Sequence, residues 1–156
     1  MVLDKSRIIT TLAVITAAIT LMALQLSRFA LDASLSHWHS GAEGYQNALA
    51  LHNTTRQPIA LFFHTDGCAS CKKLRETVLA TPEFTHYLKN VIPVKINPES
   101  GLKERQIADN YGVEGYPVFL LADINREKVV PVRTSQSLSP QEFIELCKAA
   151  QQKFGI

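Results

Sequence analysis

The chain has 156 residues, of which 46% are hydrophobic and 19% are charged, and it contains three cysteines. This length allows one domain, and the balanced composition is that of a folded globular protein. Three cysteines are too few for a disulfide-rich scaffold, and a formal net charge of +2 is too small for a protein dedicated to nucleic-acid binding.

The excess of positive charge lies in the first 28 residues, which hold Lys5, Arg7 and Arg28 against Asp4. Residues 8–27 contain no charged side chain, and a helix of that length spans about 30 Å, the thickness of the hydrocarbon layer of a membrane. Apolar residues cover every side of this helix, whereas a helix of a soluble core normally keeps a polar face. The sequence therefore predicts a transmembrane segment over residues 8–27, preceded by a cytoplasmic N-terminus over residues 1–7.

The main alternative for this segment is a cleaved signal peptide, whose apolar region is normally about 7 to 15 residues long and ends at small residues. The apolar stretch here is longer, and Leu31-Asp32-Ala33 is a poor cleavage site. We therefore predict an uncleaved signal anchor; a mature N-terminus near Ser34 would contradict it. Because basic residues stay in the cytoplasm, residues 28–41 become an outward-facing tether, and residues 42–156 become a domain in the periplasm or cell exterior.

The rest of the chain alternates between helical and extended patterns. Two strong helix starts are Thr81-Pro82 and Ser139-Pro140, each an N-cap residue followed by proline at the first helical position. The expected helices cover residues 43–52, 68–79, 82–88, 101–110 and 140–150, and the expected strands cover residues 58–64, 91–96, 117–121 and 127–132. The first strand is almost continuously apolar, and the last two are close enough to pair antiparallel. This order predicts an α/β fold with a central mixed sheet flanked by helices.

The pair Cys68-Ala69-Ser70-Cys71 stands directly after the buried strand and at the start of a helix. Unpaired backbone N–H groups at a helix start favour negative charge, so Cys68 should ionise more readily than a free cysteine. Cys71 lies one turn further on and faces inward, so it can attack a mixed disulfide formed by Cys68. We expect Cys68 to be the nucleophile and Cys71 the resolving thiol.

Two other interpretations of this pair are half of a zinc site and a purely structural disulfide. Zinc would need two more ligands, and Cys147 with a histidine is the only supply in the domain. Cys147 falls on the apolar stripe of the last helix with Phe143 and Ala150, where a buried, inert cysteine is expected.

Two separated motifs make the segment from about Pro58 onward resemble the thioredoxin superfamily of thiol-disulfide oxidoreductases. The first is the Cys-x-x-Cys pair after the apolar strand, followed by Lys72, and the second is Gly115-Tyr116-Pro117 before a strand. In that family the proline is cis and lies against the two cysteines, where the residue before it pairs with an extended substrate. The resemblance implies these substrate-binding roles for Tyr116 and Pro117.

The sequence also departs from the thioredoxin pattern. Gly67 stands where thioredoxins have a tryptophan before the first cysteine, and Phe62 stands where they bury an aspartate that accepts a proton. The nearest groups for proton transfer or for tuning the thiolate are His64, Asp66 and Lys72.

These observations predict a membrane-tethered, extracytoplasmic oxidoreductase in the inner membrane, single-pass, that reduces or isomerises protein disulfides through a mixed disulfide. Its partners would be protein or peptide thiols and disulfides, the lipid bilayer and a membrane electron-donor protein, with no nucleic acid. No cofactor is needed, since the two sulfurs carry both electrons. The alternatives are a binding or assembly module of the same fold, with a structural disulfide or a copper or zinc ion, and an oxidase that donates its disulfide.

Overall fold

The computed structural model describes residues 11–23, 35–123, 128–134 and 138–155, and it divides into two compact units, residues 1–35 and 36–156. In the first unit, residues 11–23 are helical and their side chains are exposed. Among the described residues, no helix has both the length and the apolar character needed to cross a membrane. The predicted N-terminus at residues 1–7, both ends of the predicted span, the candidate cleavage site and Ser34 lie outside the described residues.

The second unit is built on a five-stranded sheet with the strand order β1-β3-β2-β4-β5. Its strands are β1 (His39–Ser40), β2 (Ile59–Phe63), β3 (Ile92–Ile96), β4 (Val118–Ala122) and β5 (Val129–Val132). The first three strands run parallel to one another, β4 pairs antiparallel with β2, and β5 pairs antiparallel with β4. The predicted apolar strand, observed as β2, is thus the centre of the sheet.

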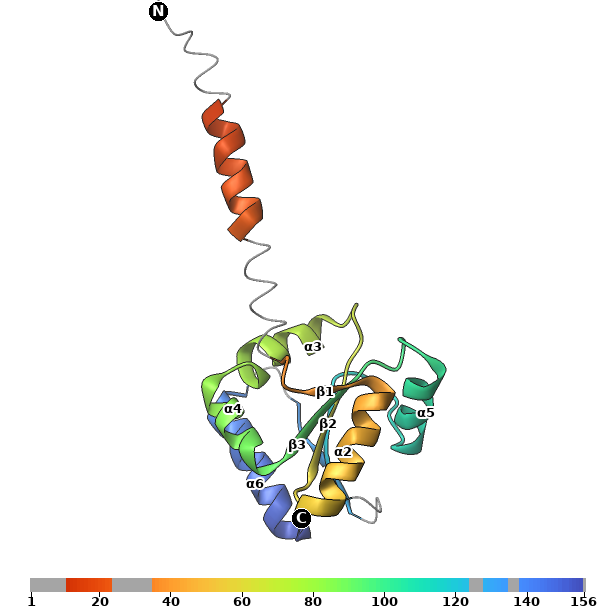
Figure 1. Cartoon of the computed structure of the whole chain (residues 1–156). Coiled ribbons are helices and arrows are strands. Elements are labelled where there is room, and N and C mark those ends of the chain that lie inside the picture. The colour runs from red at the N-terminus through yellow and green to blue at the C-terminus, as the bar shows by residue number, and fades with distance from the viewer. Residues whose placement is uncertain (1–10, 24–34, 124–127, 135–137, 156) are drawn as a thin grey trace, which may run out of the picture. The chain divides into compact units, whose positions relative to one another are not determined.

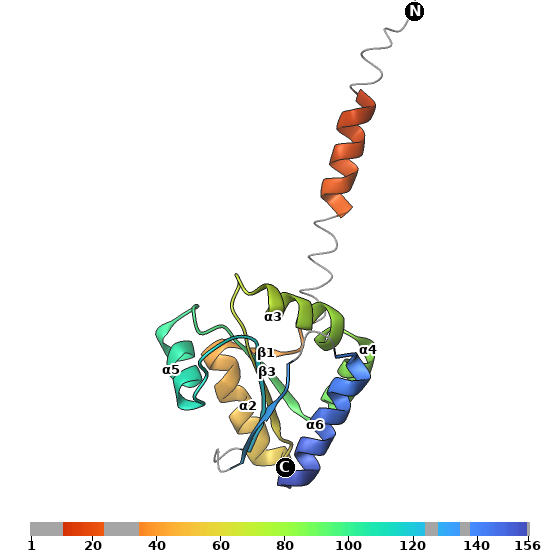
Figure 2. The same ribbon diagram turned by 180° about the vertical axis from the view of Figure 1, so that it is seen from behind.

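Helices cover both faces of this sheet (Figures 1 and 2). They are α2 (Gly41–Thr55), α3 (Ala69–Leu74), the π-helical turn η1 (Arg75–Leu79), α4 (Pro82–Tyr87), the 3-10 turn η2 (Leu88–Asn90), α5 (Leu102–Asn110) and α6 (Pro140–Phe154). Helices α2 and α5 lie on one face, while α3, α4 and α6 lie on the other. The predicted α/β fold with a mixed sheet and flanking helices is confirmed.

Alternate side chains of the central strand enter two different cores. Leu61 and Phe63 pack with residues of α2 and α5 in one core. On the opposite face, Phe119 of β4 meets the aromatic rings of α4 and α6, with its ring centroid 6.0 Å from that of Phe84 and 5.1 Å from that of Phe143. The continuous apolar run of β2 follows from this double coverage, because both of its faces are buried.

Two helices begin at the caps that the sequence predicts. The hydroxyl of Thr81 accepts a hydrogen bond from the backbone N–H of Phe84, and Pro82 is the first residue of α4. Ser139 and Glu142 form a complete capping box at the start of α6, with each side chain accepting a hydrogen bond from the other residue's backbone N–H. These caps satisfy helix N–H groups that have no partner within the helix.

The structure corrects the boundary between the predicted tether and the domain, which the sequence placed at residue 41. His39 and Ser40 form β1 and pair with Val94 and Lys95 of β3. Trp38 is buried, with its ring centroid 6.3 Å from that of Phe62. The domain therefore starts before residue 38, because the end of the expected tether contributes both an edge strand and a core side chain.

Candidate active site

The two cysteines lie where β2 leads into α3. Cys68 is the N-cap of α3, and its backbone N–H donates to the carbonyl oxygen of Thr65 at 3.3 Å. The sulfur atoms of Cys68 and Cys71 form a disulfide, with their Cα atoms 5.2 Å apart. The predicted pair is thus assembled at the end of the central strand and in its oxidised form.

The two sulfur-bearing residues differ in exposure. Cys71 is buried with 3% of its surface exposed, whereas Cys68 is only half-buried. The sulfur of Cys68 also accepts a hydrogen bond from the backbone N–H of Cys71, at 3.1 Å. A hydrogen bond to the sulfur favours the charged thiolate after reduction. The exposure and the hydrogen bond fit the predicted roles, but the assignment of Cys68 as nucleophile and of Cys71 as resolving thiol stays a prediction.

A cis peptide bond joins Tyr116 to Pro117 directly before β4. The first residue of β4, Val118, pairs with Phe63, the last residue of β2. The proline segment therefore lies at the same end of the central strands as the segment leading to Cys68. The carbonyl oxygen of Pro117 accepts a hydrogen bond from the hydroxyl of Thr134, at 3.1 Å. The cis geometry that the resemblance implies is confirmed; the substrate-binding roles of Tyr116 and Pro117 stay predictions.

A small hollow of about 100 Å³ adjoins the disulfide, and both cysteines, His64 and Arg75 contribute to its wall. The ring of His64 stacks on that of Phe62, with centroids 5.2 Å apart. Burial lowers the pKa of His64 below its usual 6.5, and the positive charge of Arg75 lowers it further. His64 is therefore neutral at neutral pH, the form in which an imidazole can accept a proton.

The other two residues predicted to tune the thiolate lie on the rim of the same hollow. Asp66 and Lys72 both contribute to its wall, and both are exposed to solvent. The ammonium of Lys72 lies 3.9 Å from the carboxylate of Glu76, one turn further along on the outer surface. The structure thus brings all three predicted residues to the pair, while their roles in proton transfer stay predictions.

Sequence reasoning missed two cationic residues that act on this site. Arg75 reaches the hollow from one turn beyond Cys71, and Lys95 of β3 pairs in register with Phe62 of β2. Lys95 also contributes to the lowered pKa of His64. A signal existed for Arg75, because residues four apart share one face of a helix and Cys71 faces inward.

The third cysteine has an entirely different setting. Cys147 of α6 is fully buried, as predicted, and burial raises the pKa of its thiol to about 12. Its thiol also interacts with the hydroxyl of Tyr87 on α4, which donates a hydrogen bond to the amide oxygen of Gln151 at 3.0 Å. Across the described ranges, no group of three or more histidine, cysteine or carboxylate side chains is arranged to hold a metal ion.

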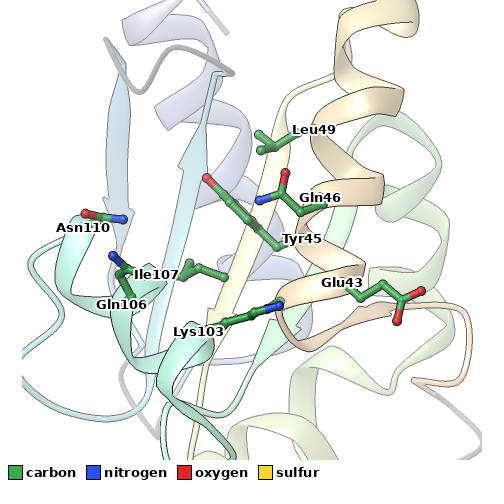
Figure 3. A pocket seen from close by; sticks show the side chains of 9 residues that line it. Glu43, Tyr45, Gln46, Leu49, Lys103, Gln106, Ile107 and Asn110 are labelled. Carbon is green, nitrogen blue, oxygen red and sulfur yellow. The ribbon is translucent and has the colours of Figure 1, made fainter.

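A larger hollow, of about 900 Å³, lies between α2 and α5 on the other face of the sheet (Figure 3). Tyr45 and Leu49 of α2 face Lys103 and Ile107 of α5 across it. The hydroxyl groups of Tyr45 and Tyr111 are hydrogen-bonded at 2.9 Å. Neither cysteine of the disulfide lines this hollow, so the chemistry of the pair belongs to the smaller one.

The mixed sheet, the disulfide at the start of α3 and the cis-proline beside the central strand define a class: a thioredoxin-fold thiol-disulfide oxidoreductase. Residues 37–123 match the family model described as thioredoxin-like. The chain belongs to this thioredoxin-like family. The predicted resemblance and the predicted enzyme class are thereby confirmed.

Comparison with solved structures agrees with this fold. The structure named DsbH oxidoreductase superposes with a TM-score of 0.66 at 22% identity, covering 74% of this chain and 83% of its own. A thioredoxin from Thermus thermophilus gives a TM-score of 0.57 at 22% identity, covering 72% of this chain and 87% of its own. The oxidised DsbD C-terminal domain from Neisseria meningitidis gives a TM-score of 0.57 at 19% identity, covering 72% of this chain and 98% of its own. No curated protein matches the chain by sequence.

Proposed function

We propose that this protein is a membrane-tethered oxidoreductase that reduces or isomerises protein disulfides outside the cytoplasm, in the bacterial periplasm. The observation that carries the enzymatic part is the division of labour in the pair. Cys68 is partly exposed and accepts a backbone hydrogen bond on its sulfur, while Cys71 is buried. This arrangement suits a first sulfur that attacks a substrate and a second that releases it.

The reaction moves two electrons from the enzyme dithiol to the substrate disulfide. The Cys68 thiolate attacks one substrate sulfur, the substrate S–S bond breaks, and the departing substrate sulfur takes up a proton. Cys71 then loses its proton and attacks the sulfur of Cys68, which breaks the mixed disulfide and releases the second substrate thiol. The enzyme is left with the Cys68–Cys71 disulfide, which is the state of this structure.

The proton that Cys71 loses needs an acceptor, because Phe62 replaces the aspartate that thioredoxins bury at this position. His64 is the best placed group: it shares the hollow with Cys71, and its lowered pKa keeps the imidazole neutral at pH 7. Asp66 is more exposed and serves as a second acceptor through water. We therefore assign the proton to His64 first.

Substrate binding fits an extended polypeptide segment. The backbone beside the cis bond at Tyr116 and Pro117 lies at the same end of the central strands as the segment leading to Cys68. Pairing of a substrate with backbone groups, rather than with side chains, tolerates many substrate sequences. A Cβ added at Gly67 or Gly115 would meet no atom within 4 Å among the described residues, so the space beside these two glycines is open. We expect protein disulfides, rather than one small molecule, as substrates.

The direction of electron flow in our proposal is reductive. Ala69 and Ser70 separate the cysteines, and no histidine stands between them to stabilise the thiolate as in strong oxidants of the family. A reductase outside the cytoplasm must itself be reduced again, so the proposal includes a membrane protein that supplies electrons as a dithiol. The uncharged residues 8–27 supply the membrane anchor, and residues 11–23 of this segment are helical with exposed apolar side chains such as Leu12 and Val14.

The reduction potential of the full chain, purified in detergent, tests the direction. A value near that of thioredoxin, about −270 mV, supports a reductase, whereas a value near about −120 mV indicates an oxidase. Retained stoichiometric copper or zinc together with no turnover of insulin disulfides would instead indicate a binding module. The matched control is Cys147→Ala, which leaves the pair intact and should give the same potential.

The tether is tested separately in bacterial cells. We expect the full chain to resist alkaline extraction from membranes, and its domain to be digested by protease added to spheroplasts. The control is a chain that starts at residue 29, which should leave the membrane fraction. Extraction of the full chain at alkaline pH, or protection of its domain from added protease, would reject the tethered, outward-facing arrangement.

A further inference from the structure

The hollow behind the disulfide holds a cation that the reaction above does not use. Arg75 contributes to its wall together with both cysteines, and the Nε atom of its guanidinium is buried. Its backbone N–H donates to the carbonyl oxygen of Cys71, one turn earlier in the same helix. The side chain therefore projects from the same face as the resolving cysteine, toward the inner side of the pair.

The local helix geometry changes at this residue. Helix α3 ends at Leu74, and η1 begins at Arg75, where the carbonyl oxygen of Arg75 accepts from the N–H of Ala80 at 2.9 Å, in the wider spacing of a π-helix. Such turns occur frequently at functional sites. The outward-facing cation of the same helix, Lys72, behaves differently: its side chain is 63% exposed and lies 3.9 Å from Glu76.

Solvent separates the effects of these two cations on a nearby thiolate. The charge of Lys72 is screened by water and by the carboxylate beside it. A guanidinium in a partly closed hollow acts through a lower dielectric, and arginine keeps its charge at every accessible pH. The imidazole of His64 already responds to this charge, because Arg75 contributes to the lowering of its pKa.

We propose that Arg75 is a positioning residue of the thiol pair: its guanidinium stabilises the thiolate formed on reduction and makes the pair a stronger oxidant. Reduction of the disulfide takes two electrons and one proton and yields one thiolate and one thiol. The thiolate attracts the guanidinium, whereas the disulfide carries no charge to attract it. The charge of Arg75 therefore favours the reduced form and lowers the pKa of the reduced pair.

Other charged groups face the pair and must be held constant in any test. His64, Asp66 and Lys72 line the hollow with the two cysteines, and Lys95 of β3 acts electrostatically on His64. Of these, Asp66 opposes the effect of Arg75 on His64, and Lys95 adds to it. The comparison of variants must therefore change only residue 75, at one pH and one ionic strength.

The test compares the full chain in detergent with the variants Arg75→Met and Arg75→Lys. The matched control is Arg105→Met, which removes an exposed arginine of α5. Equilibration with glutathione, whose reduced form supplies the electrons and leaves as glutathione disulfide, measures the potential. Thiolate absorbance against pH measures the pKa of Cys68. We expect Arg75→Met to shift the equilibrium about tenfold toward the enzyme disulfide, or about 30 mV, and to raise the pKa. Arg75→Lys should keep the equilibrium with glutathione and the pKa of Cys68 close to those of the wild type. Arg105→Met should change neither quantity.

An unchanged equilibrium and pKa in folded Arg75→Met overturn the proposal, as does a lysine variant that behaves like methionine. Should Arg75→Met fail to fold, Arg75→Gln decides by the same two measurements. The inference rests on the proposed function only in that the pair cycles between disulfide and dithiol. Failure of the Arg75 proposal is distinguishable from failure of the proposed function. If the assigned substrate or the membrane location is wrong, the variants at residue 75 should still differ in equilibrium and pKa.

Discussion

The domain holds cysteine sulfur in two opposite settings. At the end of β2, Cys68 is partly exposed, accepts a backbone hydrogen bond and is joined to Cys71 beside a hollow that Arg75 lines. In α6, Cys147 is fully buried, and the pKa of its thiol is raised to about 12. The same side chain is thus arranged for reaction at one place and protected from it at the other, and the difference comes from position in the fold.

The largest expected effect of breaking this contrast is on turnover. Cys68→Ser should lower the rate of insulin disulfide reduction by roughly a thousandfold or more, because a hydroxyl does not ionise at neutral pH as a thiol does. Cys71→Ser should keep the attack and accumulate a mixed disulfide with the substrate, seen as a mass increase that dithiothreitol removes. Turnover by Cys68→Ser near the wild-type rate would contradict the assignment of the nucleophile.

The second prediction concerns the protected thiol. In the folded, reduced protein, iodoacetamide at pH 8 should modify Cys68 first and leave Cys147 unmodified, as followed by mass spectrometry of peptides. A thiol with a pKa of about 12 is ionised roughly a thousandfold less than one near 9, and burial also blocks the reagent. In denaturant Cys147 should react like a free cysteine. Equal modification of the two residues in the folded protein would remove the contrast.

The smallest effect should appear in the pH dependence of stability. Burial and Arg75 hold the pKa of His64 below its unfolded value of 6.5, so the unfolded chain binds a proton more readily. The free energy of unfolding should therefore fall as the pH drops below 6.5. In His64→Gln the free energy of unfolding should fall less over the same pH range. Denaturant unfolding at pH 7.5 and pH 5 measures the difference. Parallel losses in the two proteins would assign the effect to other histidines.

Much of this architecture is predictable because the strongest signals are local. The caps at Thr81 and Ser139 each place a hydroxyl and a proline at the start of a helix, and both are observed. The continuous apolar run of β2 shows its central place, since both faces of the strand are buried. The Cys68–Cys71 pair was found for the same reason, because its spacing and its position at a helix start are visible in the sequence.

Features that depend on distant partners were missed. The two residues of β1 have no pattern of their own and become a strand only through pairing with β3. The burial of Trp38 depends on the rings of Phe62 and Phe84, which lie far from it in the sequence. The four-residue spacing from Cys71 signals that Arg75 lies on the inward face of the helix, whereas the change to π-helical spacing that begins at Arg75 leaves no mark in the sequence.

The two outer strands of the sheet have a consequence for self-association. At one edge β1 offers only two residues, and at the other β5 contains the exposed Pro131, which has no N–H to donate to an incoming strand. Long, regular edges are what allow one sheet to recruit another into aggregates. When the outer strands of two copies meet, they therefore offer few backbone groups that could hydrogen-bond into one continuous sheet.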